Sequence, residues 1–407
     1  MVPTGGPEAP RARVVNDNKA PWQGRDRTMK LRNLVLGTSA LVGVAALGGT
    51  VTTPAAAAEV TPGGALDITI TGFLRAEAFG GEQKDAKANS DLSDKLDFRN
   101  DTEVHVLARG KSEQTGLEYG ATIEFEADTN NTANTDETWI FLRGGWGEFR
   151  MGDEDGVVDN SIVGGQTIAA GTGGIDGSDA VTTAAPLVFP TNSNDATKIR
   201  YYTPSFGGFS LGASYTPTQT DFDSGANNGQ NRASSGGPLA MDAKNIFEGA
   251  AVYDGDFGGV GILASVVGLY GTLRNEAEDT FGDSDWWNVT GGVVVDLFGF
   301  KLAGSIGQDN PGDARRNWFT AGIGYGFGPV NTSVTYGQIF DSNNDFEEAT
   351  GFSKPNNLVF SADYALAPGL VLAGDVGVFD NDYSGDFDDG NLGEKGWQAV
   401  GRFAVNF

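Results

Sequence analysis

The last thirteen residues, Lys395 to Phe407, read KGWQAVGRFAVNF and decide the fold. With a period of two, one face carries Trp397, Ala399, Gly401, Phe403, Val405 and Phe407, and the other carries Gln398, Val400, Arg402, Ala404 and Asn406. An apolar face against a mostly polar one is the alternation of a β-strand. Chain ends usually fray, so a terminal strand that stops on an aromatic residue indicates an end held in a sheet.

The same alternation recurs along the chain, for example in GLEYGATIEFEA (residues 116–127) and NLVFSADYAL (residues 357–366). No amphipathic helical period of 3.6 residues stands out, so we predict an all-β protein. The predicted strands are sixteen, over residues 66–79, 94–110, 115–127, 136–143, 146–152, 197–203, 208–216, 245–254, 257–270, 284–296, 298–308, 315–327, 329–340, 355–365, 368–380 and 394–407.

The connections between these strands indicate how they are arranged. After every second strand the connection is short, as in TPSFGG (residues 203–208) and LAPG (residues 366–369). The alternate connections are long and polar, as in DSNNDFEEATGFSK (residues 341–354). This asymmetry is typical of a transmembrane antiparallel β-barrel, with tight periplasmic turns and long outer loops. A closed barrel pairs its last strand with its first, which would hold Phe407 in place.

Composition excludes several classes of protein. A formal net charge of −27 repels nucleic acid, so we expect no DNA or RNA partner. The chain has no cysteine and one histidine, which argues against disulfides, thiol catalysis, zinc sites and histidine-based triads. His105 falls on the lumen side of the second strand, where we expect a hydrogen-bonded wall residue. Trp286, Trp287, Trp318 and Trp397 lie near strand ends and are expected in the aromatic girdle at the membrane interface.

The N-terminal region predicts export. Residues 29–58 have the pattern of a secretory signal peptide, with a positive start at Met29, an apolar run from Leu34 to Gly49 and a small-residue cleavage site before Glu59. Residues 1–28 are interpreted as an upstream extension from a start codon assigned too early. The barrel domain would then cover residues 59–407.

One connection is long enough to have a function of its own. Residues 153–196, between the fifth and sixth strands, combine apolar residues with acids, which predicts a loop folded against the inner wall as a pore constriction. Its acids are Asp153, Glu154, Asp155, Asp159, Asp176 and Asp179. Strand parity places the bases Arg75, Arg99, Arg150, Lys198, Arg200, Lys301 and Arg402 on the lumen side. Acids facing bases across a narrow opening would create a transverse field that favours polar solutes.

Three stretches resemble the general diffusion porins of Gram-negative bacteria, nearest the alphaproteobacterial type. They are ITGFLRAEAF (residues 70–79), FRNDTEVHV (residues 98–106) and GGWGEFRMGDEDG (residues 144–156). The resemblance implies a sixteen-stranded homotrimer whose third long loop enters the lumen, with Arg75 and Arg200 among the wall bases. It also implies that Phe407 ends a C-terminal signal read by the outer-membrane assembly machinery. The third strand departs from the family because it lacks an arginine that many relatives carry there.

We therefore expect a passive, water-filled channel in the outer membrane, weakly cation-preferring, for ions and small hydrophilic solutes. The alternative is a substrate-specific channel for a sugar, an anion or another nutrient, with a binding site in the lumen. An enzyme is not expected because one histidine offers no nucleophile–base pair, and an adhesin would carry a passenger domain. No cofactor is expected beyond loosely held Ca²⁺ or Mg²⁺, for which Asp380, Asp382 and Asp386 are weak candidates that could also bridge lipopolysaccharide phosphates.

Overall fold

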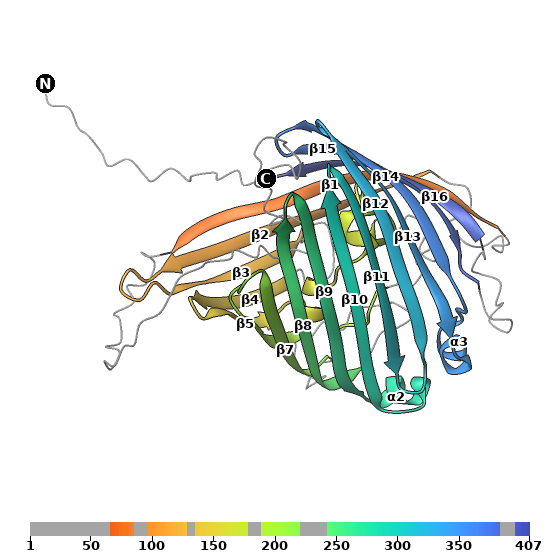
Figure 1. The fold of residues 1–407 in the computed structure, drawn as a ribbon, viewed down its shortest axis with the longest axis horizontal. Helices are drawn as coiled ribbons and strands as arrows, with labels where there is room; N and C mark the ends of the chain where they lie inside the picture. The colour runs from red at the N-terminus through yellow and green to blue at the C-terminus, as the bar shows by residue number, and fades with distance from the viewer. Residues whose placement is uncertain (1–65, 85–95, 128–134, 178–188, 220–241, 383–394) are drawn as a thin grey trace, which may run out of the picture.

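Because side chains alternate along a strand, each predicted strand can present one face to the interior of a barrel and the other to the outside. The computed structural model shows strands arranged in this way. It describes residues 66–84, 96–127, 135–177, 189–219, 242–382 and 395–407. Within these residues, sixteen antiparallel strands close into a barrel, which confirms the predicted fold (Figure 1). Every strand pairs with its neighbours in sequence, and the last strand pairs with the first.

The strands, in chain order, have the following bounds. They are β1 Asp67–Lys84, β2 Asp97–Lys111, β3 Glu118–Glu126, β4 Thr135–Gly144, β5 Gly147–Asp153, β6 Thr197–Tyr202, β7 Phe209–Thr218, β8 Ala243–Phe257, β9 Val260–Leu273, β10 Asp285–Leu297, β11 Phe300–Pro311, β12 Arg316–Phe327, β13 Val330–Ser342, β14 Asn356–Ala367, β15 Leu370–Asp380 and β16 Lys395–Asn406.

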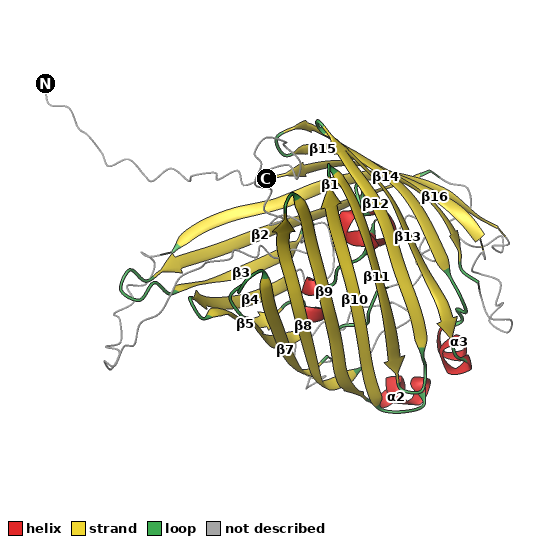
Figure 2. Cartoon of the chain, in the orientation of Figure 1, coloured by secondary structure: helices red, strands yellow, loops and turns green. Residues whose placement is uncertain are grey.

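Short helices interrupt three of the connections (Figure 2). They are α1 Val157–Ser161, η1 Gly165–Ile168, η2 Gly174–Asp176, α2 Asn275–Phe281 and α3 Asn344–Thr350. None of the helices in the described part of the chain is long and apolar enough to cross a membrane. The sequence does not reveal these helices, because two helical turns or fewer are too short for a 3.6-residue period to show. In α3, local capping defines the ends: Asn343 accepts a hydrogen bond from Phe346 N, and Gly351 takes a left-handed φ of 77°.

The two faces of the wall differ in chemistry, as β14 illustrates. Phe360 and Tyr364 are exposed at 53% and 42%, whereas Ser361, on the opposite face, is buried. In a barrel, a side chain points either to the lumen or to the outside, so the exposed apolar residues form the outer, lipid-facing belt. The buried polar face lines the interior.

The C-terminus is held as the terminal strand pattern predicts. Phe407 N donates to Gly72 O at 3.0 Å, and Gly72 N donates to Phe407 O at 2.9 Å. A side chain at Gly72 would not fit, because its Cβ would lie 2.2 Å from Glu103 O. These contacts join the end of the chain to β1 and leave no open sheet edge there.

One outer connection is shorter than expected. Only residues 312–315 join β11 to β12, because β11 extends to Pro311, beyond its predicted end at residue 308. The ladder continues to the pair Asp309 and Arg316, whose charges neutralise each other on the inner face. The prediction that every second connection is long is therefore wrong for the connection between β11 and β12.

Candidate functional site

The third loop, residues 154–196 between β5 and β6, runs along the inner face of the wall in its first described part, residues 154–177. Its backbone N–H groups donate to wall side chains on four different strands. The donor and acceptor residues are Val157 and Ser214 (3.3 Å), Gly165 and Thr320 (2.8 Å), Ala170 and Ser333 (2.8 Å), and Thr172 and Asp375 (3.0 Å). The acceptors lie on β7, β12, β13 and β15, so the loop reaches from one side of the barrel to the other. In Figure 2 its short helices are visible behind β9 to β12.

Apolar residues of the third loop pack against apolar residues of the wall. Val163 and Ile168 form a buried cluster with Leu263 and Val294. The wall accommodates this approach because Gly292 has no side chain, and a Cβ there would lie 1.7 Å from Val163 O. Burial of these side chains stabilises the docked loop by about 25 cal/mol per Å² of apolar area removed from water.

Two tryptophans belong to this interior packing. Trp286 and Trp318 are fully buried in the cluster that includes Val157 and Val158 of the loop, so their expected place in the girdle is wrong. Trp286 Nε1 donates to Thr191 Oγ1 at 2.8 Å. Neighbours on a strand face opposite ways, so Trp287 is the one that points outward.

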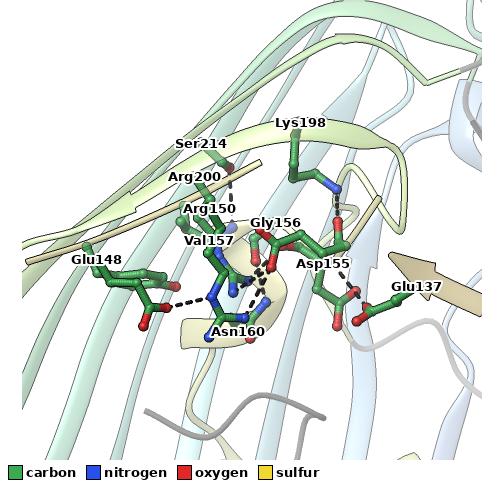
Figure 3. A network of polar contacts seen from close by, with 12 residues as sticks. Glu137, Glu148, Arg150, Asp155, Gly156, Val157, Asn160, Lys198, Arg200 and Ser214 are labelled. Atoms are coloured by element: carbon green, nitrogen blue, oxygen red, sulfur yellow. Dashed lines mark hydrogen bonds and ion pairs between the residues drawn. The ribbon is translucent and has the colours of Figure 1, made fainter. Parts of the chain in front are cut away.

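A buried ionic cluster fixes the start of the third loop (Figure 3). The Glu154 carboxylate lies 2.7 Å from Arg200 and 3.3 Å from Arg150, and its side chain is 1% exposed. Lys198 Nζ donates to Glu154 O, and Arg200 Nη1 donates to Asp155 O at 2.8 Å. Three of the predicted wall bases are therefore in direct contact with the loop, rather than across an opening from it.

A second ionic cluster lies on β1, β2 and β16. Glu77 is buried between Arg99, at 2.5 Å, and Arg402, at 2.6 Å. Arg75 pairs with Asp101 at 2.8 Å. The side chains of Arg75 and Arg99 are 33% and 38% exposed, so these two bases remain accessible from the interior. Arg402 also donates to Thr172 O at 3.5 Å, which brings the third loop to this cluster.

The other acids of the third loop have different environments. Asp153 is buried and Asp176 is exposed, whereas Asp179 lies outside the described residues. Asp159 accepts a hydrogen bond from Asn192 Nδ2 at 3.0 Å. Burial raises the pKa of Asp159 to about 6, and the Asp176 carboxylate acts in the same direction. Burial also raises the pKa of Asp155 well above its ordinary value, assisted by Asp159.

The weak calcium candidates are not brought together by any contact in the described residues. Asp380 pairs with Lys395 Nζ at 2.8 Å. The Asp382 carboxylate accepts from Lys354 N at 3.1 Å. Asp386 lies outside the described residues.

The wall carboxylates that hold the third loop are not among the site residues predicted from the sequence. Glu248 accepts from Ser193 N at 2.8 Å and from Val158 N at 3.4 Å. Asp309 accepts from Thr191 N at 3.4 Å, and Asp375 accepts from Gly174 N at 3.2 Å. Each is an acid on the lumen side by parity, which the sequence shows. That each meets a backbone N–H depends on the path of the loop, which the sequence does not show.

This closed barrel with a polar interior can be compared with known proteins. A family model described as Gram-negative porin matches residues 40–384. The chain belongs to the Gram-negative porin family. Porins of this kind are passive channels of the outer membrane, and the protein is accordingly an outer-membrane diffusion channel.

Solved structures agree with this assignment of the porin fold. A mutant of the Rh. blastica porin has a TM-score of 0.55 at 15% identity, covering 84% of this chain and 100% of the other. A triple mutant of the Rhodopseudomonas blastica porin has a TM-score of 0.54 at 15% identity with the same coverage. No curated protein matches this porin in sequence.

Proposed function

We propose that this porin is a general channel for ions and small hydrophilic solutes, that it prefers cations weakly, and that its third loop narrows the passage. The observation that carries the proposal is the path of the loop: its backbone bonds to inward-facing side chains from β7 to β15. A chain segment crossing a lumen must reduce its free cross-section. Passive diffusion through such an opening requires neither a cofactor nor a catalytic group.

The weak cation preference rests on which charges remain accessible. Glu148 and Glu154 balance the charges of Arg150 and Arg200, with which they pair, so this largely buried group contributes little field to the passage. The accessible bases Arg75 and Arg99 oppose the overall negative charge of −27. A negative mouth raises the local cation concentration, and the wall arginines limit this effect.

The alternative, a substrate-specific channel, would need a row of binding groups along the lumen. The accessible arginines on β1 and β2 would suit an anionic solute. Blocking experiments with candidate anions and sugars in planar bilayers distinguish the two. A general channel shows no saturable block.

Selectivity is tested by the reversal potential in a KCl gradient. Replacing Arg75 and Arg99 with glutamine should shift it toward stronger cation preference, because two accessible positive charges are removed from the passage. Asp176→Asn should shift it toward anions, because that acid is exposed on the loop. Both shifts should diminish at high salt, where screening shortens the field.

The matched control is Asp345→Asn on α3, which removes one exposed charge from a different connection, the one between β13 and β14. It should leave the reversal potential close to that of the unmodified protein. If the Asp345 and Asp176 variants behave alike, the third loop does not set selectivity and the proposed constriction is wrong.

We also propose that the chain is exported with residues 29–58 as its signal peptide, forms a homotrimer and associates with lipopolysaccharide. N-terminal sequencing of the protein from outer membranes should give a start near Glu59. A start at Val2 would contradict the proposed signal peptide.

A further inference from the structure

Strands β2 and β3 bring the one histidine of the chain next to two glutamates. The strand register places His105 directly opposite Glu124, and Glu103 lies two residues before His105 on the same inner face. His105 Nε2 lies 2.8 Å from Glu103 Oε2 and 3.6 Å from Glu124 Oε2. One ligand atom from each residue falls within 4.8 Å of the others.

We propose that Glu103, His105 and Glu124 form a binding site for a divalent transition-metal ion on the inner wall of the channel. Zn²⁺ bound by imidazole nitrogen and carboxylate oxygen at 2.0–2.2 Å has neighbouring ligand atoms about 3.4 Å apart in a tetrahedral site. The two observed separations lie on either side of that spacing, so small side-chain rotations would suffice. Three protein ligands leave a fourth position open to water or to a solute.

The environment of Glu124 independently indicates a cation. Its side chain is only 4% exposed, and no group in the described residues donates a hydrogen bond to its carboxylate. Its one ion-pair contact there is His105, beyond hydrogen-bonding distance. A buried carboxylate without a donor is costly, and a bound cation would satisfy it. His105 and Glu124 also line a cavity of about 130 Å³, which has room for an ion and a water. Arg109, Arg143 and Arg150 line the same cavity, and Glu148 pairs with the latter two.

Neighbouring groups support this assignment. The ring of Phe73 packs edge-on against the His105 ring at 6.3 Å between centroids and fixes its position. Glu126 and Asp136 place two further carboxylates within 4.8 Å of Glu103, which increases the attraction for a cation. The imidazole favours zinc, copper or nickel over calcium and magnesium, which prefer oxygen ligands only.

Composition alone argued against zinc, because structural zinc sites draw on several cysteines and histidines. The structure changes that conclusion, since carboxylates supply the remaining ligands. This site is independent of the proposed ion selectivity, and binding can be measured without any current through the channel.

The first experiment uses calorimetry with Zn²⁺ as the probe. The full porin is extracted from outer membranes in detergent and purified without a polyhistidine tag, so that His105 is the only imidazole. We expect one saturable Zn²⁺ site and no comparable heat with Mg²⁺. His105→Gln and Glu124→Gln should each weaken Zn²⁺ binding more than about tenfold, a loss that even supporting groups of metal sites reach.

Glu118→Gln is the matched control, because Glu118 lies on the same strand and face as Glu124 but pairs with Lys111. It should bind Zn²⁺ as the unmodified porin does. Equal affinity in the unmodified porin and His105→Gln would overturn the site.

A second measurement needs no substitution, so it holds even if a variant fails to fold. Histidine labelled with ¹⁵N gives the signals of a single ring, and those signals should shift when Zn²⁺ is added. If the imidazole signals stay unchanged at saturating Zn²⁺, His105 is not a ligand and the inference is wrong.

Discussion

At the scale of single residues, the buried pair of Arg316 and Asp309 shows how charge is tolerated inside this wall. The two side chains are 2% and 0% exposed and lie 2.5 Å apart. Removing one partner leaves a buried charge unpaired, which typically lowers the stability of the fold by about 3–5 kcal/mol. We predict that Asp309→Asn lowers the free energy of unfolding by about that amount, as measured by urea titration in detergent micelles.

Two comparisons test the reason for that loss. The double variant Asp309→Asn with Arg316→Met should recover most of the stability, because no unpaired charge remains. Asp380→Asn breaks the more exposed pair with Lys395 and should cost no more than about 1 kcal/mol. Equal losses for Asp309→Asn and Asp380→Asn would show that burial of the pair does not matter.

At the scale of elements, the docking of the third loop against the wall is expected to depend on pH. The pKa of Asp159 in the docked loop is raised to about 6, above the ordinary value of 3.8. Protonation therefore favours the docked state, so docking strengthens as pH falls through about 6 and gains no more below about 4. We predict greater amide-exchange protection of residues 154–177 at pH 5 than at pH 7.5, after correction for intrinsic exchange rates.

Asp159→Asn is the control for this effect. The asparagine Oδ1 can still accept the hydrogen bond from Asn192, but it does not titrate. Protection in this variant should change less between the two pH values, with the remainder due to Asp155, whose pKa is also raised. A variant with the full pH dependence would show that Asp159 is not the titrating group.

At the scale of the whole molecule, the height of the wall is uneven. β5 and β6 contain 7 and 6 residues, whereas a strand that spans a bilayer needs about 9–11. Exposed apolar residues here, including Ile140 on β4 at 53% and Met151 on β5 at 50%, would face a poorly matched bilayer. We infer that this side packs against neighbouring copies. Ile140→Asn should therefore lower the temperature at which the trimer dissociates, as read from gels of samples heated to a series of temperatures.

Ile306→Asn on β11 is the matched control, because Ile306 is 60% exposed and lies across the barrel from β4. It should leave the dissociation temperature unchanged. A monomeric mass for the unmodified porin in mild detergent would exclude the trimer altogether.

The sequence by itself determined the barrel, its strand number and the inward set of charged residues. These follow from alternation with a period of two, which is a local property of each strand. It did not determine the end of β11, where the pair of Asp309 and Arg316 extends the ladder.

Only the tertiary structure decided which inward groups meet. Parity places Glu77 and Arg99 on the same face, but the strand register makes them partners. The path of the third loop brings Glu154 onto Arg200 and buries both, and it places Val157 and Val158 in the buried cluster that contains Trp318. Such contacts join segments far apart in the chain, and a periodic pattern carries no information about them. The physical reason is that register and loop path are set by the sum of many pairings, not by any one stretch of sequence.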